Sequence, residues 1–163
     1  GSLHITYRGG AGDGFGNAMQ QLNAEPYRGK RITLTGWLRA KDVLQAPTAG
    51  VAMWMRIDGA DGSMTLDNMG SRLLRGTTEW TSVAITLDVP SDAMGITLGV
   101  MLFGQSGEGW ADDLELRDAR PDETPTATVS SVRMPLEEIA RARAMYGRAP
   151  SVLRNPSFGE LRR

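Results

Sequence analysis

Along most of the chain, apolar and polar residues alternate in short stretches that are separated by clusters of glycine, proline, aspartate and asparagine. Alternation with a period of two is typical of β-strands that bury one face, since successive side chains point to opposite sides of a sheet. On this basis we predict eight strands, over residues 3–7, 17–24, 31–39, 50–57, 63–67, 80–89, 95–103 and 108–117. Short strands with such turns between them indicate a sandwich or barrel.

The same alternation predicts which side of each strand faces the core. Apolar side chains share one parity in four of the strands: Ile32, Leu34 and Leu38; Val51, Met53, Met55 and Ile57; Val83, Ile85, Leu87 and Val89; Ile96, Leu98, Val100 and Leu102. The opposite parity carries Trp37, Trp54, Arg56 and Met101, where small polar residues would be expected against solvent. The outer face of the sandwich is therefore a candidate binding or packing surface.

The alternation stops after Leu116, and the residues that follow are rich in proline, threonine and serine, which is typical of a linker. A helix is predicted from about Pro135 to Gly147, because proline suits a first helical turn and Glu137 and Glu138 favour the positive end of the helix dipole. We thus expect a β-sandwich over residues 1–118, a linker over 119–133, and a helix with an extended tail over 134–163, packing on the sandwich or on a partner.

The composition of the chain argues against several classes of function. The chain has 163 residues, enough for one core, and a net charge of −1 without a dense basic segment, so nucleic-acid binding is not expected. No apolar run approaches the roughly 20 residues that span a bilayer, so we expect no membrane contact. The absence of cysteine excludes disulfides and thiolate metal sites and leaves the compartment open, with a bacterial cytoplasm as our expectation.

Nothing in the sequence indicates a catalytic centre. His4 is the single histidine and follows no nucleophile motif. The glycine-rich stretch over residues 9–16 lacks the Gly-Lys-Ser/Thr ending of a phosphate-binding loop. We therefore expect a protein that is not an enzyme and has no cofactor, apart from a structural calcium ion considered below.

Several segments together resemble a bacterial jelly-roll module of the galactose-binding-like or carbohydrate-binding-module-like kind. They are Pro26-Tyr27-Arg28-Gly29-Lys30-Arg31, Gly36-Trp37-Leu38, Trp54-Met55-Arg56-Ile57-Asp58-Gly59, Leu66-Asp67-Asn68-Met69, Gly76-Thr77-Thr78-Glu79-Trp80 and Trp110-Ala111-Asp112-Asp113-Leu114. The resemblance implies an all-β fold, an antiparallel jelly-roll β-sandwich of about eight strands, here with a C-terminal helical tail. It also implies a binding or packing role instead of catalysis.

Asp112 is the candidate metal ligand. Parity on the last strand groups it with Trp110, Leu114 and Leu116 on the core side, and a buried carboxylate needs a cation or several donors. The resemblance implies that such an aspartate can help to bind a structural Ca²⁺. The alternative is a carboxylate that accepts backbone and hydroxyl hydrogen bonds, and on either reading Asp112→Asn should destabilise the domain more than Asp113→Asn.

The candidate ligand-binding residues are those of the outer face together with one strand corner: Trp37, Trp54, Arg56, Asp67, Asn68 and Met101. Flat aromatic rings stack on sugar faces, a guanidinium forms a planar fork of hydrogen bonds, and an amide both donates and accepts. Our leading hypothesis is a non-catalytic ligand-binding or sensory module that receives a small polar or carbohydrate-like ligand on the outer, concave sheet face. We also expect Trp54→Ala combined with Arg56→Ala to remove binding at little cost in stability.

The alternative hypothesis is a structural or protein-interaction domain that self-associates, as a homodimer, through its tail and aromatic face. Modules of this kind usually open with an Asn-x-x-Phe-Glu-like strand, and none precedes Leu3, whereas residues 153–160 look like such a strand. We therefore expect residues 152–160 to add to a sheet edge, within the chain or in a second copy, with Phe158 as the anchor.

Overall fold

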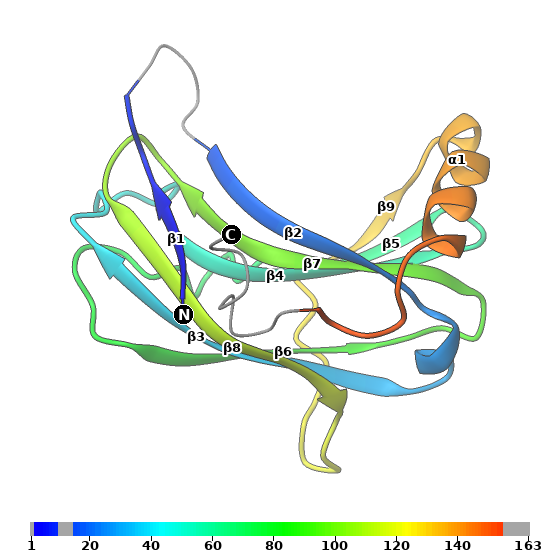
Figure 1. Cartoon of the computed structure of the whole chain (residues 1–163). Coiled ribbons are helices and arrows are strands. Elements are labelled where there is room, and N and C mark those ends of the chain that lie inside the picture. The colour runs from blue at the N-terminus through cyan, green and yellow to red at the C-terminus, as the bar shows by residue number, and fades with distance from the viewer. Residues whose placement is uncertain (1, 10–14, 155–163) are drawn as a thin grey trace.

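The strands pair into two antiparallel sheets that pack face to face (Figure 1). The computed structural model describes residues 2–9 and 15–154, and its strands are β1 (Leu3–Thr6), β2 (Phe15–Asn23), β3 (Arg31–Lys41), β4 (Gly50–Gly59), β5 (Ser63–Asp67), β6 (Thr81–Asp88), β7 (Ala93–Phe103), β8 (Glu108–Asp118) and β9 (Val129–Arg133). A 3₁₀ turn, η1 (Glu25–Tyr27), follows β2, and α1 (Leu136–Gly147) is the α-helix. The predicted helix and the eight predicted strands are confirmed.

The strand order is that of a jelly roll. One sheet runs β1-β8-β3-β6 and the other β2-β7-β4-β5-β9, so consecutive strands over β1 to β8 alternate between the sheets except β4 and β5, which pair in the same sheet. The strand β9 adds to the outside of β5, within the stretch expected to be a linker. Five residues that include Ser130 and Ser131 give too short an alternation to be recognised as a strand.

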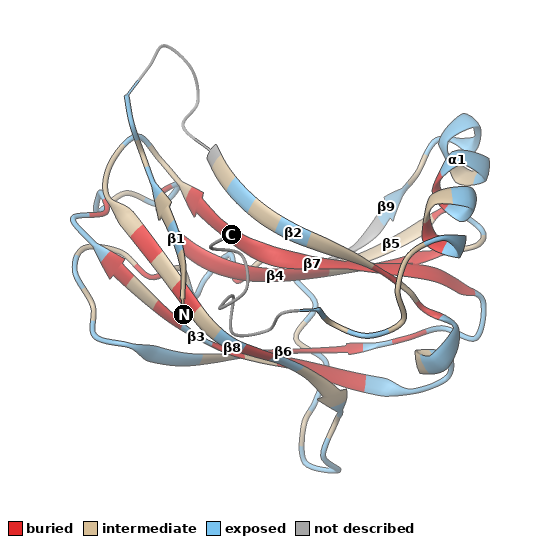
Figure 2. Ribbon diagram, viewed as in Figure 1, coloured by how far each residue is buried: buried red, intermediate tan, exposed pale blue. Residues whose placement is uncertain are grey.

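The core lies between the two sheets and follows the predicted parity on the central strands. Leu34, Met53 and Ile85 have no exposed surface and Leu98 is 1% exposed. Figure 2 shows β4 and β7 as almost continuously buried, whereas β2 alternates between exposed and intermediate residues. The strands β4 and β7 are buried on both faces along much of their length, so parts of their outer face are shielded from solvent as well.

Parity fails on β8, where a bulge interrupts the pairing with β3. Thr35 pairs with Glu115 and Trp37 with Asp112, so one residue of β3 lies opposite two of β8. Asp113 takes up the irregularity with a φ of 50°. The even-numbered residues of β8 therefore face outward before the bulge and toward the core after it. Asp112 lies on the outer face beside Trp37, so the expectation that it points into the core is wrong.

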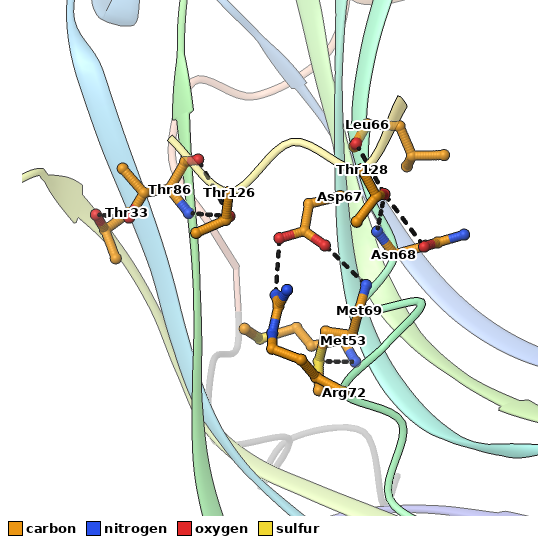
Figure 3. Close-up of polar contacts among 10 residues, drawn as sticks. All are labelled: Thr33, Met53, Leu66, Asp67, Asn68, Met69, Arg72, Thr86, Thr126 and Thr128. Atoms are coloured by element: carbon orange, nitrogen blue, oxygen red, sulfur yellow. Dashed lines mark hydrogen bonds and ion pairs between the residues drawn. The ribbon is translucent and has the colours of Figure 1, made fainter. Parts of the chain in front are cut away.

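A short segment closes one flank of the sandwich on its way from β8 to β9. The Thr126 amide donates to the Thr86 carbonyl on β6 at 2.8 Å, and the Thr128 amide donates to the Leu66 carbonyl on β5 at 2.8 Å. Their hydroxyls make further bonds to the same two strands (Figure 3). Because β6 and β5 belong to different sheets, this segment ties the sheets together along that edge.

The helix α1 lies against the outer face of the five-stranded sheet, at one end of it (Figure 1). Ala142 and Tyr146 form a small second cluster with Met94, the residue that follows the start of β7. Gly95 leaves room for the Tyr146 ring, since a Cβ at Gly95 would lie about 2.0 Å from that ring. No helix among the described residues is both long and apolar enough to cross a membrane.

Candidate functional site

The outer face of the five-stranded sheet is curved, and α1 lies at one end of it (Figure 1). We call this surface the trough and define it by Asn17, Met19, Trp54, Arg56 and Met101. Cross-strand pairing places them on one face: Asn17 pairs with Met101 across β2 and β7, and Gly99 pairs with both Met19 and Trp54. The structure thus brings together three of the predicted ligand-binding residues, Trp54, Arg56 and Met101.

Trp54 forms the floor of the trough. Its indole is 7% exposed, and its Nε1 donates a hydrogen bond to Asn17 Oδ1 at 3.0 Å. The residue between Trp54 and Met19 is Gly99, where a Cβ would lie about 2.3 Å from the Ala18 carbonyl oxygen. The close approach of β2 to β7 therefore requires glycine there, and no side chain separates the indole from Met19, which is 55% exposed.

At the other end of the trough, Arg56 belongs to a buried polar network under α1. Its Nε lies 2.8 Å from Asp58 Oδ1 and its Nη2 donates to Asp58 Oδ2 at 3.0 Å. The Tyr146 hydroxyl also donates to Asp58, so it accepts the Thr97 hydroxyl at 2.7 Å. Burial and the neighbouring Asp58 carboxylate raise the pKa of Tyr146 to about 12.

This network changes the expected effect of removing the two outer-face residues. Asp58 has no exposed surface, so loss of Arg56 leaves a buried carboxylate short of its cation. Loss of Trp54 removes a ring that is almost fully buried. Both residues lie on the outer face as predicted, but the burial of Trp54 and of Asp58 leads us to expect that replacing both with alanine destabilises the fold.

The predicted corner residues Asp67 and Asn68 lie outside the trough. Asp67 lies between the sheets with no exposed surface, where it accepts the Met69 amide at 2.8 Å and pairs with Arg72 Nη2 at 2.8 Å (Figure 3). Asn68 Oδ1 accepts the Thr128 hydroxyl at 3.3 Å, and Asn68 thereby joins the segment that closes the flank. Both residues hold the corner in place.

Trp37 lies on the opposite side of the molecule, on the outer face of the four-stranded sheet, where it is 46% exposed. Its neighbours there form a cross-strand row. His4 and Trp110 stack with ring centroids 4.6 Å apart, and the Arg39 guanidinium lies 5.3 Å from the Trp110 ring centre. Parity alone could not distinguish the two outer faces, because it assigns each strand a side without saying to which sheet the strand belongs.

Asp112 is the predicted calcium ligand. It is half-buried, and its Oδ1 accepts the amide of Asp113 at 2.9 Å. Ca²⁺ takes six to eight oxygen ligands, and among the described residues no three His, Asp or Glu side chains are grouped so that they could hold a metal ion. Asp112 therefore belongs to no cluster of acidic side chains among the described residues, and calcium binding there stays a prediction.

Two functional features escaped the sequence pattern. Asn17 shares the outer parity of β2 with Met19 and is the residue that orients the Trp54 indole. Tyr146 lies on the side of α1 that faces the sheet, and its contact with Asp58 joins residues far apart in the chain. No pattern in the sequence near either residue predicts that contact.

Comparison with known proteins gives one relative and several similar structures. No family model matches the chain. The relative is the "Uncharacterized HTH-type transcriptional regulator YbfP" of Bacillus subtilis (strain 168), 37% identical over 124 residues, which are 76% of this chain and 39% of that protein. The chain thus spans about two-fifths of the length of this relative.

Solved structures similar to the chain include carbohydrate-binding modules, the class that the sequence resemblance named. A "Family 16 Carbohydrate Binding Module-2" matches 71% of this chain and 75% of its own at a TM-score of 0.48 and 14% identity. The C-terminal family 22 carbohydrate-binding module of Clostridium thermocellum Xyn10B matches 75% of this chain and 95% of its own, with a TM-score of 0.44 and 14% sequence identity. At these values the likenesses carry no argument about a ligand, and the assignment of a jelly roll rests on the strand order.

Proposed function

We propose that the chain is a non-catalytic ligand-binding module that receives a small polar or carbohydrate-like ligand in the trough. The observation that supports this is the composition of a curved sheet face of which α1 covers one end. Trp54 and Met101 form its apolar floor, each 7% exposed, while Asn17 and Met19 remain exposed beside them. Apolar floors with a few polar groups at the rim are typical of small-molecule sites.

The polar groups at the rim suit a ligand with hydroxyl groups. The Asn17 amide accepts the indole N–H through Oδ1 and also carries two N–H donors that a ligand oxygen can accept. Arg56 keeps about a third of its side chain exposed (34%), although it pairs with Asp58. A ligand would contact Met19 and the small part of Trp54 that stays exposed, while its hydroxyls bond to Asn17 and Arg56.

The relative suggests the setting in which such a module would act. A match over 124 of 163 residues must include most of the sandwich strands. The helix-turn-helix motif that gives the relative its name is helical, so the shared region is not that motif. We propose that the module serves as the ligand-sensing part of a regulator of this type.

Paired tryptophan substitutions test the site. Trp54→Phe and Trp37→Phe make the same chemical change on opposite faces, and phenylalanine keeps most of the apolar bulk. A panel of monosaccharides, galacto- and xylo-oligosaccharides and nucleosides is titrated by calorimetry against the parent and both variants. We expect Trp54→Phe to weaken the affinity at least tenfold and Trp37→Phe to leave it unchanged. The opposite pattern would place the site on the other sheet, and no binding by any compound would contradict the proposal.

A second candidate function is self-association through the outer face of the four-stranded sheet. Trp37 is 46% exposed there, and exposed aromatic residues are enriched in protein interfaces. Sedimentation equilibrium over a wide concentration range should then show a dimer that Trp37→Ala dissociates. A monomer at all concentrations would exclude this candidate.

A further inference from the structure

The two sheets leave an apolar cavity of about 360 Å³ beside β1 and β2, each of which is the edge strand of its sheet. Apolar side chains from both sheets line it: Leu3, Ala18, Leu98, Val100 and Leu114. Ala18 pairs with Val100 across the strands, so both side chains lie on the inner face, opposite to Trp54. Met19 of the trough also borders the cavity, so an experiment has to separate the two sites.

The volume of the cavity sets the size of the molecule that it can hold. Benzene fills an apolar cavity of roughly 150 Å³, so 360 Å³ suits a body of about two fused rings, or an aliphatic chain of similar bulk. Small-molecule sites in proteins begin at roughly 300 Å³. A molecule in the cavity would gain dispersion contacts with a lining that otherwise lacks partner atoms.

The chain that follows α1 forms one wall of the opening. The Pro150 carbonyl accepts the Asn23 amide at 2.9 Å, and the Ser151 carbonyl accepts the Tyr27 hydroxyl at 2.6 Å. Pro150 itself lines the cavity. These bonds to the end of β2 and to η1 hold the wall in place.

This part of the chain does not form the strand that we expected. Residues 152–160 were predicted to add to a sheet edge, with Phe158 as the anchor. Residues 152–154 are not part of a strand, and residues 155–160, Phe158 included, lie outside the described residues. The candidate site consists of residues up to Arg154 only.

Polar groups gather at the opening of the cavity. Among the described residues that line it, Arg154 is the one with a charged side chain, and Gln20 and Gln21 line it as well. Gln20 Oε1 accepts the Arg154 amide at 2.9 Å and Gln20 Nε2 donates to the Arg154 carbonyl, which fixes the backbone of Arg154 there. A guanidinium at one end of an apolar cavity favours a ligand with a carboxylate at the corresponding end.

We infer that this cavity is a second ligand site, which binds a small carboxylic acid with an apolar body of about the size of two fused rings. The apolar body packs between the two sheets against Leu98, Val100 and Leu114, and the carboxylate lies at the opening beside Arg154. The inference does not depend on the ligand proposed for the trough, because the two sites use opposite faces of the same sheet.

Titration of 2-naphthoate into methyl-labelled full chain tests the site directly. We expect the methyl signals of Leu98 and Val100 to shift, and nuclear Overhauser effects to connect them to the naphthalene protons. Absence of these shifts and contacts up to the solubility limit of the probe would overturn the inference. The measurement uses the parent chain, so it does not depend on how well any variant folds.

A variant that fills the cavity separates it from the trough. Ala18→Leu adds bulk inside the cavity, whereas Ala84→Leu makes the same change at an exposed position on β6. We expect Ala18→Leu to weaken 2-naphthoate binding about tenfold or more, and Ala84→Leu and Trp54→Phe to leave it unchanged. Binding that Trp54→Phe weakens and Ala18→Leu leaves intact would place the probe in the trough and overturn the inference.

A change of head group tests the role of Arg154. Arg154→Gln should weaken the binding of 2-naphthoate several-fold and leave the binding of the uncharged 2-naphthylmethanol unchanged. Arg148→Gln, at an exposed arginine just after α1, is the matched control and should change neither affinity. Calorimetry measures all of these affinities. An Arg154→Gln variant that binds 2-naphthoate as tightly as the parent would contradict the assignment of a carboxylic acid.

Discussion

Asp58 is a carboxylate without exposed surface, and three side chains from three elements account for its burial. Arg56 on β4 supplies the positive charge and Tyr146 on α1 supplies a hydroxyl donor that Thr97 on β7 in turn supports. A buried charge is costly unless it is paired and hydrogen-bonded, so this network fixes where the helix sits. The network also pairs Arg56, which the sequence analysis predicted to bind a ligand, with Asp58.

We predict that Tyr146→Phe lowers the free energy of unfolding by about 1–3 kcal/mol, since it removes a hydrogen bond to a buried charged group but keeps the ring. Chemical denaturation at neutral pH measures the change. Tyr27→Phe, which removes a hydroxyl that donates to the uncharged Ser151 carbonyl, serves as the comparison and should cost less. Equal costs in the two variants would contradict the role assigned to the Tyr146 hydroxyl.

The same hydroxyl predicts a dependence of stability on alkaline pH. The pKa of Tyr146 is raised from 10.0 to about 12 in the folded state, mainly by burial. Because the folded value lies above the unfolded one, this contribution is complete below pH 10 and is lost as the pH rises through 12. Unfolding free energies measured between pH 9 and 12 should fall more steeply for the parent than for Tyr146→Phe. Parallel curves would argue against a buried, un-ionised tyrosine.

At the scale of elements, sequence periodicity predicted the positions of the strands closely, but a bulge at one residue made it assign the wrong face to part of β8. Alternation holds only while each residue advances the strand by one position, and the bulge at Asp113 adds an extra residue. For the residues of β8 that precede Asp113 the predicted and observed faces are opposite, which is why Asp112 was placed in the core. The strand β9 escaped prediction for another reason, because it is stabilised by pairing with β5 more than by any pattern of its own.

The bulge makes a prediction that separates backbone from side-chain effects. Asp113 has a φ of 50°, a conformation that β-branched residues strongly disfavour. We expect Asp113→Val to cost about 1–2 kcal/mol and Asp113→Gly to be neutral or stabilising. Glu115→Val, at an exposed position two residues along the same strand, controls for the added apolar surface. Thermal unfolding distinguishes them, and tolerance of valine at 113 would contradict the bulge.

The segment that joins the two sheets should also contribute to stability. Thr126 and Thr128 bond through their hydroxyls to β6 and β5, respectively. Replacing both with valine keeps the shape and removes the hydroxyls, for an expected loss of about 1 kcal/mol each. Thr124→Val, at an exposed position nearby, is the control. If the double variant unfolds at the same denaturant concentration as this control, the segment does not tie the sheets.

For the whole molecule, turns and periodicity predicted a β-sandwich or barrel with a C-terminal helix, and the resemblance to jelly-roll modules implied the jelly-roll topology. It could not predict the trough, since that surface depends on sheet curvature, on where α1 packs and on which outer face each strand belongs to. Trp37 and Trp54 share the outer parity of their strands, yet they lie on opposite faces of the sandwich. A pattern along one strand holds no information about the partner sheet.

Leu98 tests the sheet packing as a whole, because it lies on the inner face of β7 and is 1% exposed. We expect Leu98→Ala to cost about 2–5 kcal/mol, the range for a core leucine. Met19→Ala, at a residue of β2 that is 55% exposed, should cost far less. A loss below about 1 kcal/mol for Leu98→Ala would contradict the register of β7.

The indole N–H resonances of the chain report on both outer faces at once. Trp54 donates its N–H to Asn17 inside the trough, whereas Trp37 lies on the other sheet. When a binding sugar or nucleoside from the panel is titrated into ¹⁵N-labelled protein, our account predicts that the Trp54 indole signal and the amides of Asn17 and Met19 shift together while the Trp37 signal stays in place. Shifts that centre on Trp37, or no shift with any compound, would contradict the claim that the trough is the ligand site.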